Sequence, residues 1–222
     1  MKELTTNIFI CLLLTLFSCH QSRKQENITV IKKDTLTTTN NPISKVTYKQ
    51  EVDKLPKELL EFVPKNYSVL DTVSGDLNLD KIKDFILVLK KNEEEKSSNV
   101  VDNPEKRPLL ILLQDKNKKL QLTKRNDKAV YCIDCGGIMG DPYMGITIKN
   151  GYFSVEHYGG SAWRWQRIIT FIYSKQENEW FLHKDGFESF HVNEPEKIES
   201  NISTIKDFGK LKFEEYDIYK EN

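Results

Sequence analysis

The amino-acid sequence predicts a mostly-β protein of the α+β class, with a twisted antiparallel meander sheet and one short N-terminal amphipathic helix. Two compact apolar runs, Phe85–Leu89 and Leu109–Leu113, are short enough to be buried strands rather than helices. Asn150-Gly151 separates two runs in which apolar and polar residues alternate, which is the pattern of a two-residue hairpin. A longer alternating run follows at 163–173. Together these observations favour consecutive antiparallel strands.

The first predicted element is a helix at 55–63. Pro56 stands in the first turn, where a helix tolerates proline, and Pro64 ends the pattern. The apolar face of this helix consists of Leu55, Leu59, Phe62 and Val63. Further along the chain, the polar segment 115–119 separates two apolar stretches and is predicted to connect a hairpin.

The second half of the chain carries the strongest strand pattern. Apolar and polar residues alternate again after the Asn-Gly turn, with Phe153, Val155 and His157 on one face. One face of the next strand is also apolar, interrupted only by Arg167, and it carries Trp163, Trp165, Ile169, Phe171 and Tyr173. A polar turn at 174–179 then predicts a partner strand that begins near Trp180. In the tail, a last helix is expected from Ile205, Phe208, Leu211 and Phe213.

Charge and composition exclude one class of partner. The chain has 222 residues, with 33 basic and 33 acidic side chains, so its formal net charge is zero. Binding to nucleic-acid phosphates needs a basic excess, and nucleic acid is therefore not an expected partner. The predicted organisation is an N-terminal leader at 1–18, a flexible tether at 19–48 and a single mostly-β domain at 49–222. The tether is predicted from its polar composition.

The first eighteen residues have the layout of an export signal. Lys2 stands near the start, an apolar run at 8–17 is too short to span a bilayer, and the small residue Ser18 precedes Cys19. Leu16-Phe17-Ser18-Cys19 resembles the lipobox of bacterial lipoproteins. The resemblance implies cleavage before Cys19, with lipid on the Cys19 thiol and on the new amino terminus. An ordinary secretory signal and an uncleaved anchor are the alternatives.

Lipid on Cys19 would make a membrane the first partner of the protein. His20 and Gln21 follow Cys19. By the sorting rule for lipoproteins of two-membraned bacteria, residues other than aspartate at these positions favour the outer membrane. The resemblance therefore implies a location in the cell envelope. No polybasic patch accompanies the apolar segment, so the lipid itself is the expected membrane contact.

Two cysteines remain for the folded domain. Cys11 would leave with the signal peptide and Cys19 would carry lipid, which leaves Cys132 and Cys135. An even pair in an exported protein predicts a small structural disulfide. Redox catalysis is an alternative for this C-x-x-C spacing. A zinc site would need further ligands, such as His157 and His183.

Residues 75–84 place oxygen-bearing side chains at alternate positions, a pattern that suits calcium. The pattern resembles the Asp-x-Asn-x-Asp-Gly-x-x-Asp loops of dockerin, FG-GAP and related calcium-binding repeats, with Lys81 in place of the glycine. The resemblance implies Asp76, Asn78, Asp80 and Asp84 as side-chain ligands and Ile82 as a carbonyl ligand. The alternative is a turn held by bonds from Asp and Asn side chains to the backbone.

The segment 157–165 gathers unusual residues beside paired glycines. A stacking platform for a sugar or a peptide is predicted from His157, Tyr158, Trp163, Arg164 and Trp165. The alternative is that the two tryptophans belong to the core of a strand. Ser161 with His157 could form a hydrolytic pair, although the chain lacks the G-x-S-x-G pattern of a nucleophile elbow and no acid partner can be named.

Four blocks of sequence, at 75–84, 107–113, 132–143 and 151–165, look like an uncharacterised family of exported bacterial proteins and lipoproteins. The resemblance covers 55–183 and implies a single domain without assigning an activity. The predicted function is a membrane-anchored, non-catalytic binding or envelope accessory module with an unidentified envelope ligand or protein as partner. The alternatives are a thiol–disulfide or hydrolytic envelope enzyme, and an immunity-type inhibitor of a secreted toxin.

Overall fold

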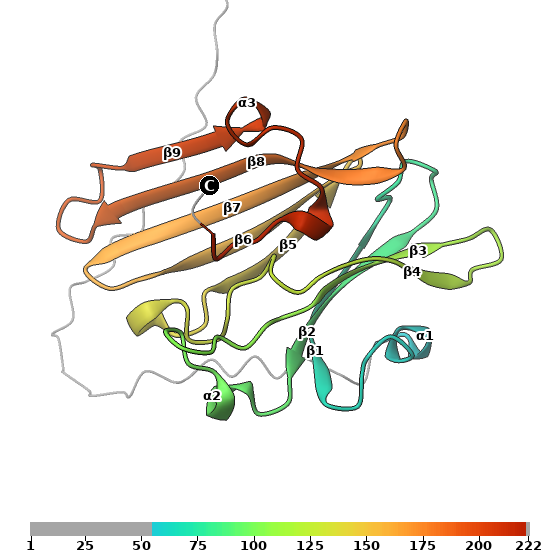
Figure 1. The fold of residues 1–222 in the computed structure, drawn as a ribbon, viewed down its shortest axis with the longest axis horizontal. Coiled ribbons are helices and arrows are strands. Elements are labelled where there is room, and N and C mark those ends of the chain that lie inside the picture. The colour runs from blue at the N-terminus through green and yellow to red at the C-terminus, as the bar shows by residue number, and fades with distance from the viewer. Residues whose placement is uncertain (1–54, 221–222) are drawn as a thin grey trace, which may run out of the picture. The chain divides into compact units, whose positions relative to one another are not determined.

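The computed structural model describes residues 55–220, so the predicted signal peptide, Cys19 and the predicted tether lie outside the described residues. Within 55–220 the chain forms nine strands in two antiparallel sheets, and in both sheets consecutive strands are neighbours (Figure 1). A mostly-β fold built from antiparallel meanders is therefore confirmed. No helix in this part of the chain has the length and apolar character needed to cross a bilayer.

The first sheet contains β1 (Tyr67–Gly75), β2 (Asp84–Lys91), β3 (Leu109–Gln114) and β4 (Leu120–Asn126). The second sheet contains β5 (Tyr143–Lys149), β6 (Tyr152–Gly160), β7 (Trp163–Ser174), β8 (Glu179–His191) and β9 (Glu199–Thr204). The helices are α1 (Lys57–Leu60), α2 (Glu94–Ser97) and α3 (Ile205–Phe208), with 3-10 turns η2 (Gly137–Met139) and η3 (Phe213–Glu215).

The prediction of one continuous sheet is wrong, because the chain leaves the ladder after β4 and starts a second sheet at β5. Two sheets can bury a face of each against the other, whereas a single open sheet would leave both faces uncovered. The main core joins the sheets: β2 and β3 contribute Ile86, Val88, Leu109 and Ile111, and β6, β7 and β8 contribute Phe153, Val155, Ile169, Phe171, Trp180 and Leu182. We call the face of the second sheet that carries Phe153 and Ile169 its inner face.

The two apolar runs of the sequence are the central strands β2 and β3, as predicted. Their alternate residues Leu87, Leu89, Leu110 and Leu112 form a second buried cluster on the opposite face. Leu59 of α1 is fully buried in this cluster. Both faces of these strands are thus covered, and this explains why their sequences are apolar throughout rather than alternating. The helix predicted at 55–63 has only the four residues of α1.

The turns follow the local sequence closely. Asn150 and Gly151 both have positive φ, 52° and 76°, and connect β5 to β6 as the Asn-Gly pattern predicts. The hairpin predicted at 115–119 joins β3 to β4, with Lys118 at φ 64°. In the tail the expected helix is reduced to α3 and η3, and the edge strand β9 precedes them without having been predicted.

A β-bulge in β8 sets which side chains reach the inner face. Thr170 pairs with Lys184, but the next residue, Phe171, pairs with Leu182, so His183 is an extra residue on β8. This shift places Asp185 opposite Ile169, and Phe187 opposite Arg167. The C-terminal segment then passes across this face (Figure 1). There the Tyr216 hydroxyl donates to Asp185 Oδ2 at 2.8 Å.

Candidate functional site

The candidate site is a groove of about 550 Å³ on the inner face of the second sheet. Its floor is formed by Trp165 and Arg167 of β7, Asp185 and Phe187 of β8, and Asn201 and Ser203 of β9. Its walls come from the loops and the tail: Val100, Tyr131, Cys135, Ile218, Tyr219 and Lys220. The volume falls in the range of roughly 300–1,000 Å³ that is typical of sites for small molecules, and the mixture of aromatic and polar groups is also typical.

Aromatic rings dominate the groove. The rings of Trp165 and Phe187 have centroids 6.2 Å apart and planes that differ by 21°, so they form one broad, nearly flat surface. The Tyr131 ring packs edge-on against Trp165 and also against Tyr219, with centroid distances of 5.7 Å in both pairs. Phe187 remains 38% exposed and Trp163, two residues before Trp165, remains 53% exposed. The aromatic surface is therefore accessible and extends beyond the groove along β7.

The lack of a side chain at Gly159 allows the Trp165 ring to lie where it does. A Cβ on Gly159, in the neighbouring strand β6, would lie 2.5 Å from Cζ2 of Trp165 and 2.9 Å from Cα of Gly136. The indole therefore rests directly against the backbone of β6. The Gly160 amide donates to the Gly136 carbonyl at 2.9 Å, which fixes the glycine-rich loop on the end of β6. Gly159, the first of the paired glycines of the sequence, thus has a packing role.

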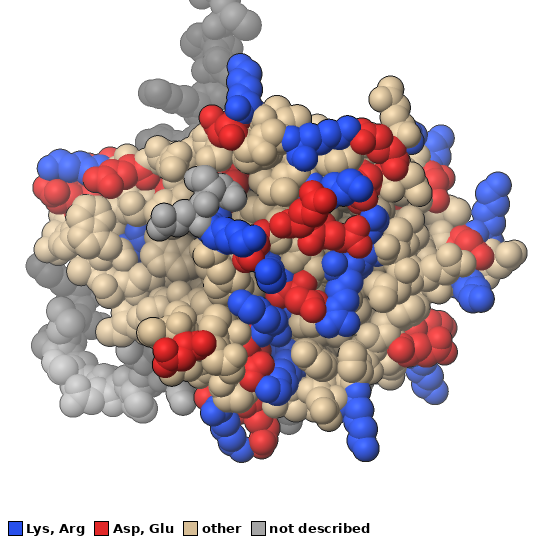
Figure 2. All heavy atoms as spheres, in the orientation of Figure 1, with Lys and Arg blue, Asp and Glu red and all other residues tan. Residues whose placement is uncertain are grey.

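The charges at the base of the groove compensate each other. Arg167 donates Nε to Asp185 Oδ1 at 2.9 Å and Nη2 to Oδ2 at 2.7 Å, and its Nη1 donates to the Tyr131 hydroxyl at 2.7 Å. Burial opposes the guanidinium charge, but the bonds to Asp185 outweigh it and raise the pKa of Arg167. In Figure 2, Lys, Arg, Asp and Glu gather over the centre of this face. The area to the left, over the end of β7, is mostly uncharged, and charged side chains lie above it near the turn from β8 to β9.

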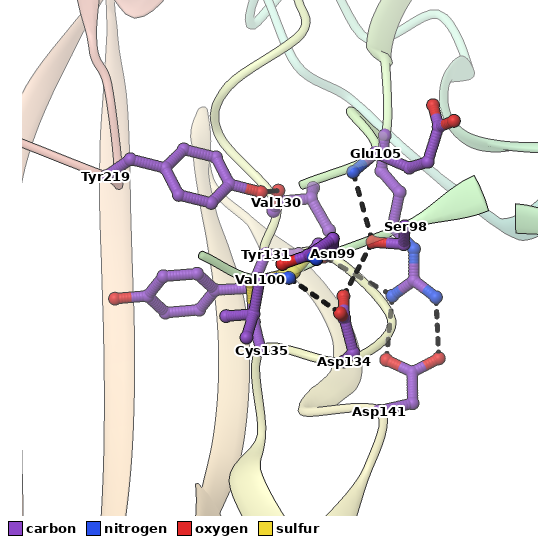
Figure 3. Close-up of a disulfide and its surroundings, with 12 residues drawn as sticks. Ser98, Asn99, Val100, Glu105, Val130, Tyr131, Asp134, Cys135, Asp141 and Tyr219 are labelled. Carbon is purple, nitrogen blue, oxygen red and sulfur yellow. Dashed lines mark hydrogen bonds and ion pairs between the residues drawn. A yellow bond between two sulfur atoms is a disulfide. The ribbon is translucent and has the colours of Figure 1, made fainter. Parts of the chain in front are cut away.

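A disulfide-bearing loop forms one wall. Cys132 and Cys135 lie at disulfide distance, with sulfurs 2.07 Å apart, as predicted from the sequence. Asp134, between them, accepts from the Ser98 hydroxyl at 2.6 Å and from the Val100 amide at 2.7 Å. Figure 3 shows the rings of Tyr131 and Tyr219 on one side of this loop and Asp134 turned to the other side. The loop therefore ties the tyrosine wall to the segment after α2.

A buried ion-pair cluster around Arg107 connects the loops that form this wall of the groove. Arg107, which has no exposed surface, binds Glu94 of α2 through Nε and Nη2 at 3.1 and 2.6 Å. Its Nη1 and Nη2 also donate to Asp141 at 2.7 and 2.8 Å (Figure 3), and Nη1 reaches the Tyr131 carbonyl at 3.3 Å. One side chain thus joins α2, the Tyr131 loop and the approach to β5. Burial opposes its charge, but the carboxylates raise the pKa of Arg107.

The structure divides the predicted platform between the two faces of the sheet. Trp163 and Trp165 point to the inner face, and Trp165 lines the groove. Tyr158 pairs with Gln166, and Arg164 pairs with Gly160, so both belong to the opposite face. The five residues predicted as one platform therefore do not form one surface.

His157 lies inside the protein and is not part of the accessible surface. It is fully buried, and its Nε2 accepts from the Tyr131 amide at 3.3 Å. Its Nδ1 has no hydrogen-bond partner among the residues that the structure describes. Burial, together with the charges of Arg167 and Arg107, lowers the pKa of His157 to about 3. His157 thus packs beneath the groove. Ser161, the other residue of the hydrolytic pair considered from the sequence, lies in the exposed turn after β6.

The Asp/Asn loop precedes β2, and its carboxylates converge. Oxygen atoms of Asp76, Asp80 and Asp84 all lie within 4.8 Å of one another. The Lys81 backbone has φ 70°, so it makes the turn at the position where the calcium-binding loops that this segment resembles have glycine. The carboxylates also accept bonds from the loop itself: Asp76 from the Lys81 amide at 3.0 Å, and buried Asp84 from the Leu77 amide at 2.9 Å. Burial and the charges of Asp80 and Asp76 raise the pKa of Asp84.

Comparisons of this chain with protein-family models, with curated proteins and with solved structures found no match. Function must therefore be inferred from the groove itself. Sequence reasoning identified Trp165 but missed the other floor residues, Arg167, Asp185, Phe187, Asn201 and Ser203. One pattern pointed to Arg167 and Asp185: Arg167 interrupts an otherwise apolar strand face, and a cation on such a face needs an acidic partner on a neighbouring strand.

Proposed function

We propose that this protein is an exported, lipid-anchored module of the bacterial cell envelope that binds a ligand in the groove on its second sheet. The proposal has two parts. The lipobox-like segment before Cys19 supports the anchor, and the groove supports binding. The observation that carries the binding part is the accessible aromatic floor of Trp165 and Phe187, which lies beside the polar side chains of Asn201 and Ser203.

The groove is suited to binding rather than to proton transfer. Arg167 and Asp185 hold each other in a bidentate pair, and His157 is buried beneath the floor. Apart from this ion pair, the floor of the groove offers flat rings, one amide and one hydroxyl group. Such groups orient a ligand and bond to it, which is the chemistry of a recognition site.

The anchor is tested with the variant Cys19→Ser. Cells that express the natural chain or the variant are labelled with a clickable fatty-acid analogue and fractionated into membranes and soluble extract. We expect label and membrane association for the natural chain, and loss of both for the variant. Unchanged membrane association of Cys19→Ser would overturn the anchor.

Binding is tested with a library of small neutral fragments and a thermal-shift readout, because a ligand of the folded state raises the melting temperature by mass action. Trp165→Ala removes the floor, and Tyr158→Ala is the matched control on the opposite face of the sheet. We expect fragments that stabilise the natural chain and Tyr158→Ala but not Trp165→Ala. Fragments that stabilise all three proteins equally would show that the groove is not the site.

Calcium is a second candidate ligand, at the separate loop of Asp76, Asp80 and Asp84. The convergence of the three carboxylates supports it, because a divalent cation would relieve their mutual repulsion. Asn78 and the Ile82 carbonyl would complete the oxygen set. Calorimetry should show one calcium ion per chain, and Asp80→Asn should weaken its binding. A titration without heat and without a change in melting temperature would leave the loop as a turn held by its own hydrogen bonds.

A further inference from the structure

The floor of the groove combines flat rings with neutral polar groups in a defined order. Arg167, Phe187 and Asn201 are neighbours across β7, β8 and β9, and Asp185 and Ser203 form the next row. Trp165 lies in the row on the other side, so the rings of Trp165 and Phe187 adjoin diagonally. Each ring is thus next to a side chain that can donate or accept a hydrogen bond.

The side-chain polar groups that β9 contributes to the floor are available to a ligand. Neither the Asn201 amide nor the Ser203 hydroxyl has a hydrogen-bond partner within residues 55–220, and Asn201 is exposed. An amide and a hydroxyl both donate and accept, so they match a ligand whose groups also do both. Hydroxyl groups have this property, whereas carboxylates and phosphates only accept when ionised.

The charges around the groove do not select an ion. Arg167 and Asp185 neutralise each other, and Lys220 at the rim is the remaining charged residue of the lining. A site for phosphate or for an acidic peptide would present uncompensated arginine or lysine side chains at its floor. The mostly uncharged area in Figure 2 agrees with a neutral ligand.

The position of the groove argues against an extended peptide. Peptides that add a strand to a sheet need unpaired backbone groups at its edge. This groove lies on the face of the sheet, where β8 uses its backbone groups to pair with β7 and β9. The unpaired backbone groups of the edge strand β9 point along the plane of the sheet, away from β8 and not into the groove. Recognition must therefore use side chains, and the dominant side chains are flat rings.

We infer that the groove binds a neutral saccharide chain, with one sugar ring stacked on Trp165 and Phe187 and its hydroxyl groups bonded by Asn201 and Ser203. The inference rests on the proposed function and names its ligand class. A pyranose ring has an apolar face of C–H bonds, which suits the negative face of an aromatic ring, and a rim of hydroxyl groups. Trp163 extends the aromatic surface by two residues, roughly 7 Å, so a second ring can follow the first.

Isothermal titration calorimetry of the purified full chain tests this inference, in a detergent without a sugar head group. The probes are three neutral tetrasaccharides, namely cellotetraose, chitotetraose and maltotetraose, with tetragalacturonate and tetraalanine as comparators. We expect one neutral tetrasaccharide to bind with 1:1 stoichiometry and more tightly than the comparators. Trp165→Ala and Asn201→Ala should each weaken this binding about tenfold, and Tyr158→Ala should leave it unchanged.

Phe187→Ala provides a second variant at an exposed position, in case Trp165→Ala does not fold. The inference is overturned if no neutral tetrasaccharide binds, or if binding persists unchanged in Phe187→Ala and Asn201→Ala. Binding of tetragalacturonate or tetraalanine alone, sensitive to Phe187→Ala, would overturn the saccharide class and leave the proposed binding function in place. The membrane anchor is unaffected by any of these results, because Cys19→Ser tests it separately.

Discussion

The substitution Gly159→Ala should displace the floor of the groove, because this position has no room for a side chain. The added Cβ would lie 2.5 and 2.8 Å from two indole carbons of Trp165, and 2.9 Å from Cα of Gly136. Carbon atoms that are not bonded prefer separations of about 3.5–4.0 Å. The indole is rigid and its other neighbour is backbone, so either Trp165 or the loop at Gly136 must move by roughly 1 Å.

Overpacking of this kind costs about 1–3 kcal/mol. In a domain of this size each kcal/mol lowers the melting temperature by roughly 2–4 °C, so we expect a fall of roughly 2–12 °C. Differential scanning calorimetry measures it. Binding to the groove should weaken in parallel, because Trp165 is part of its floor.

Gly186→Ala is the matched control, in the neighbouring strand β8. A Cβ on Gly186 would meet only the Ile168 carbonyl oxygen, at 3.8 Å, which is ordinary contact. Alanine in a strand is about 0.5–1 kcal/mol more favourable than glycine, so this variant should melt at a slightly higher temperature than the natural chain. If Gly159→Ala melts like the natural chain or like Gly186→Ala, the close packing of Trp165 against β6 is refuted.

Three further predictions concern the support of the groove. Replacing both Cys132 and Cys135 with serine should lower the free energy of unfolding by about 2 kcal/mol, since a short loop is no longer closed in the unfolded chain; an unchanged urea midpoint would contradict this. Acid should destabilise the protein as the pH falls from about 6.5 towards 3, by up to about 1.4 kcal/mol per pH unit, because the folded pKa of His157 lies below its unfolded value. His157→Phe should flatten this part of the stability–pH curve, and an equal slope in both proteins would assign the effect to other groups. Arg107→Met should cost about 3–5 kcal/mol in urea unfolding because it leaves Glu94 buried without its partner; adding Glu94→Leu should recover part of the loss, and a single variant as stable as the natural chain would rule out this role for the cluster.

Local patterns in the sequence were enough to predict most of the strands. The Asn150-Gly151 turn needs positive φ at both positions, and the structure has it. The two leucine-rich runs are central strands with both faces covered. These features depend on a few neighbouring residues, so a single sequence contains the information. The division into two sheets depends on how distant surfaces pack, and no local pattern reports it.

Strand β9 could not be predicted from the periodicity of the sequence. Its first four residues are exposed on both faces, so the sequence has no alternation that would mark a strand. Edge strands of this kind are held by backbone pairing with one neighbour. The sequence therefore did not indicate that Asn201 and Ser203 belong to the floor of the groove, and only the folded structure shows it.

The bulge in β8 explains why the floor could not be assembled from the sequence. With regular pairing, an alternation that starts at Trp180 and Leu182 would continue to Lys184 and Gly186 on the inner face. The extra residue His183 reverses the alternation and brings Asp185 and Phe187 there instead. The burial of His157, in contrast, was foreseeable, because it alternates with the core residues Phe153 and Val155. A histidine side chain suggests a chemical role, but the position of His157 in this alternation indicated that it packs in the core.

Binding in the groove can be followed through the indole N–H groups of the full chain by ¹H–¹⁵N NMR during titration with small neutral ligands. The chain has three tryptophans: Trp165 in the floor of the groove, Trp163 beside it, and Trp180 fully buried in the core. We predict that the Trp165 resonance shifts and saturates while the Trp180 resonance stays in place. If no ligand moves the Trp165 resonance, or if it moves only together with that of Trp180, the groove is not a binding site.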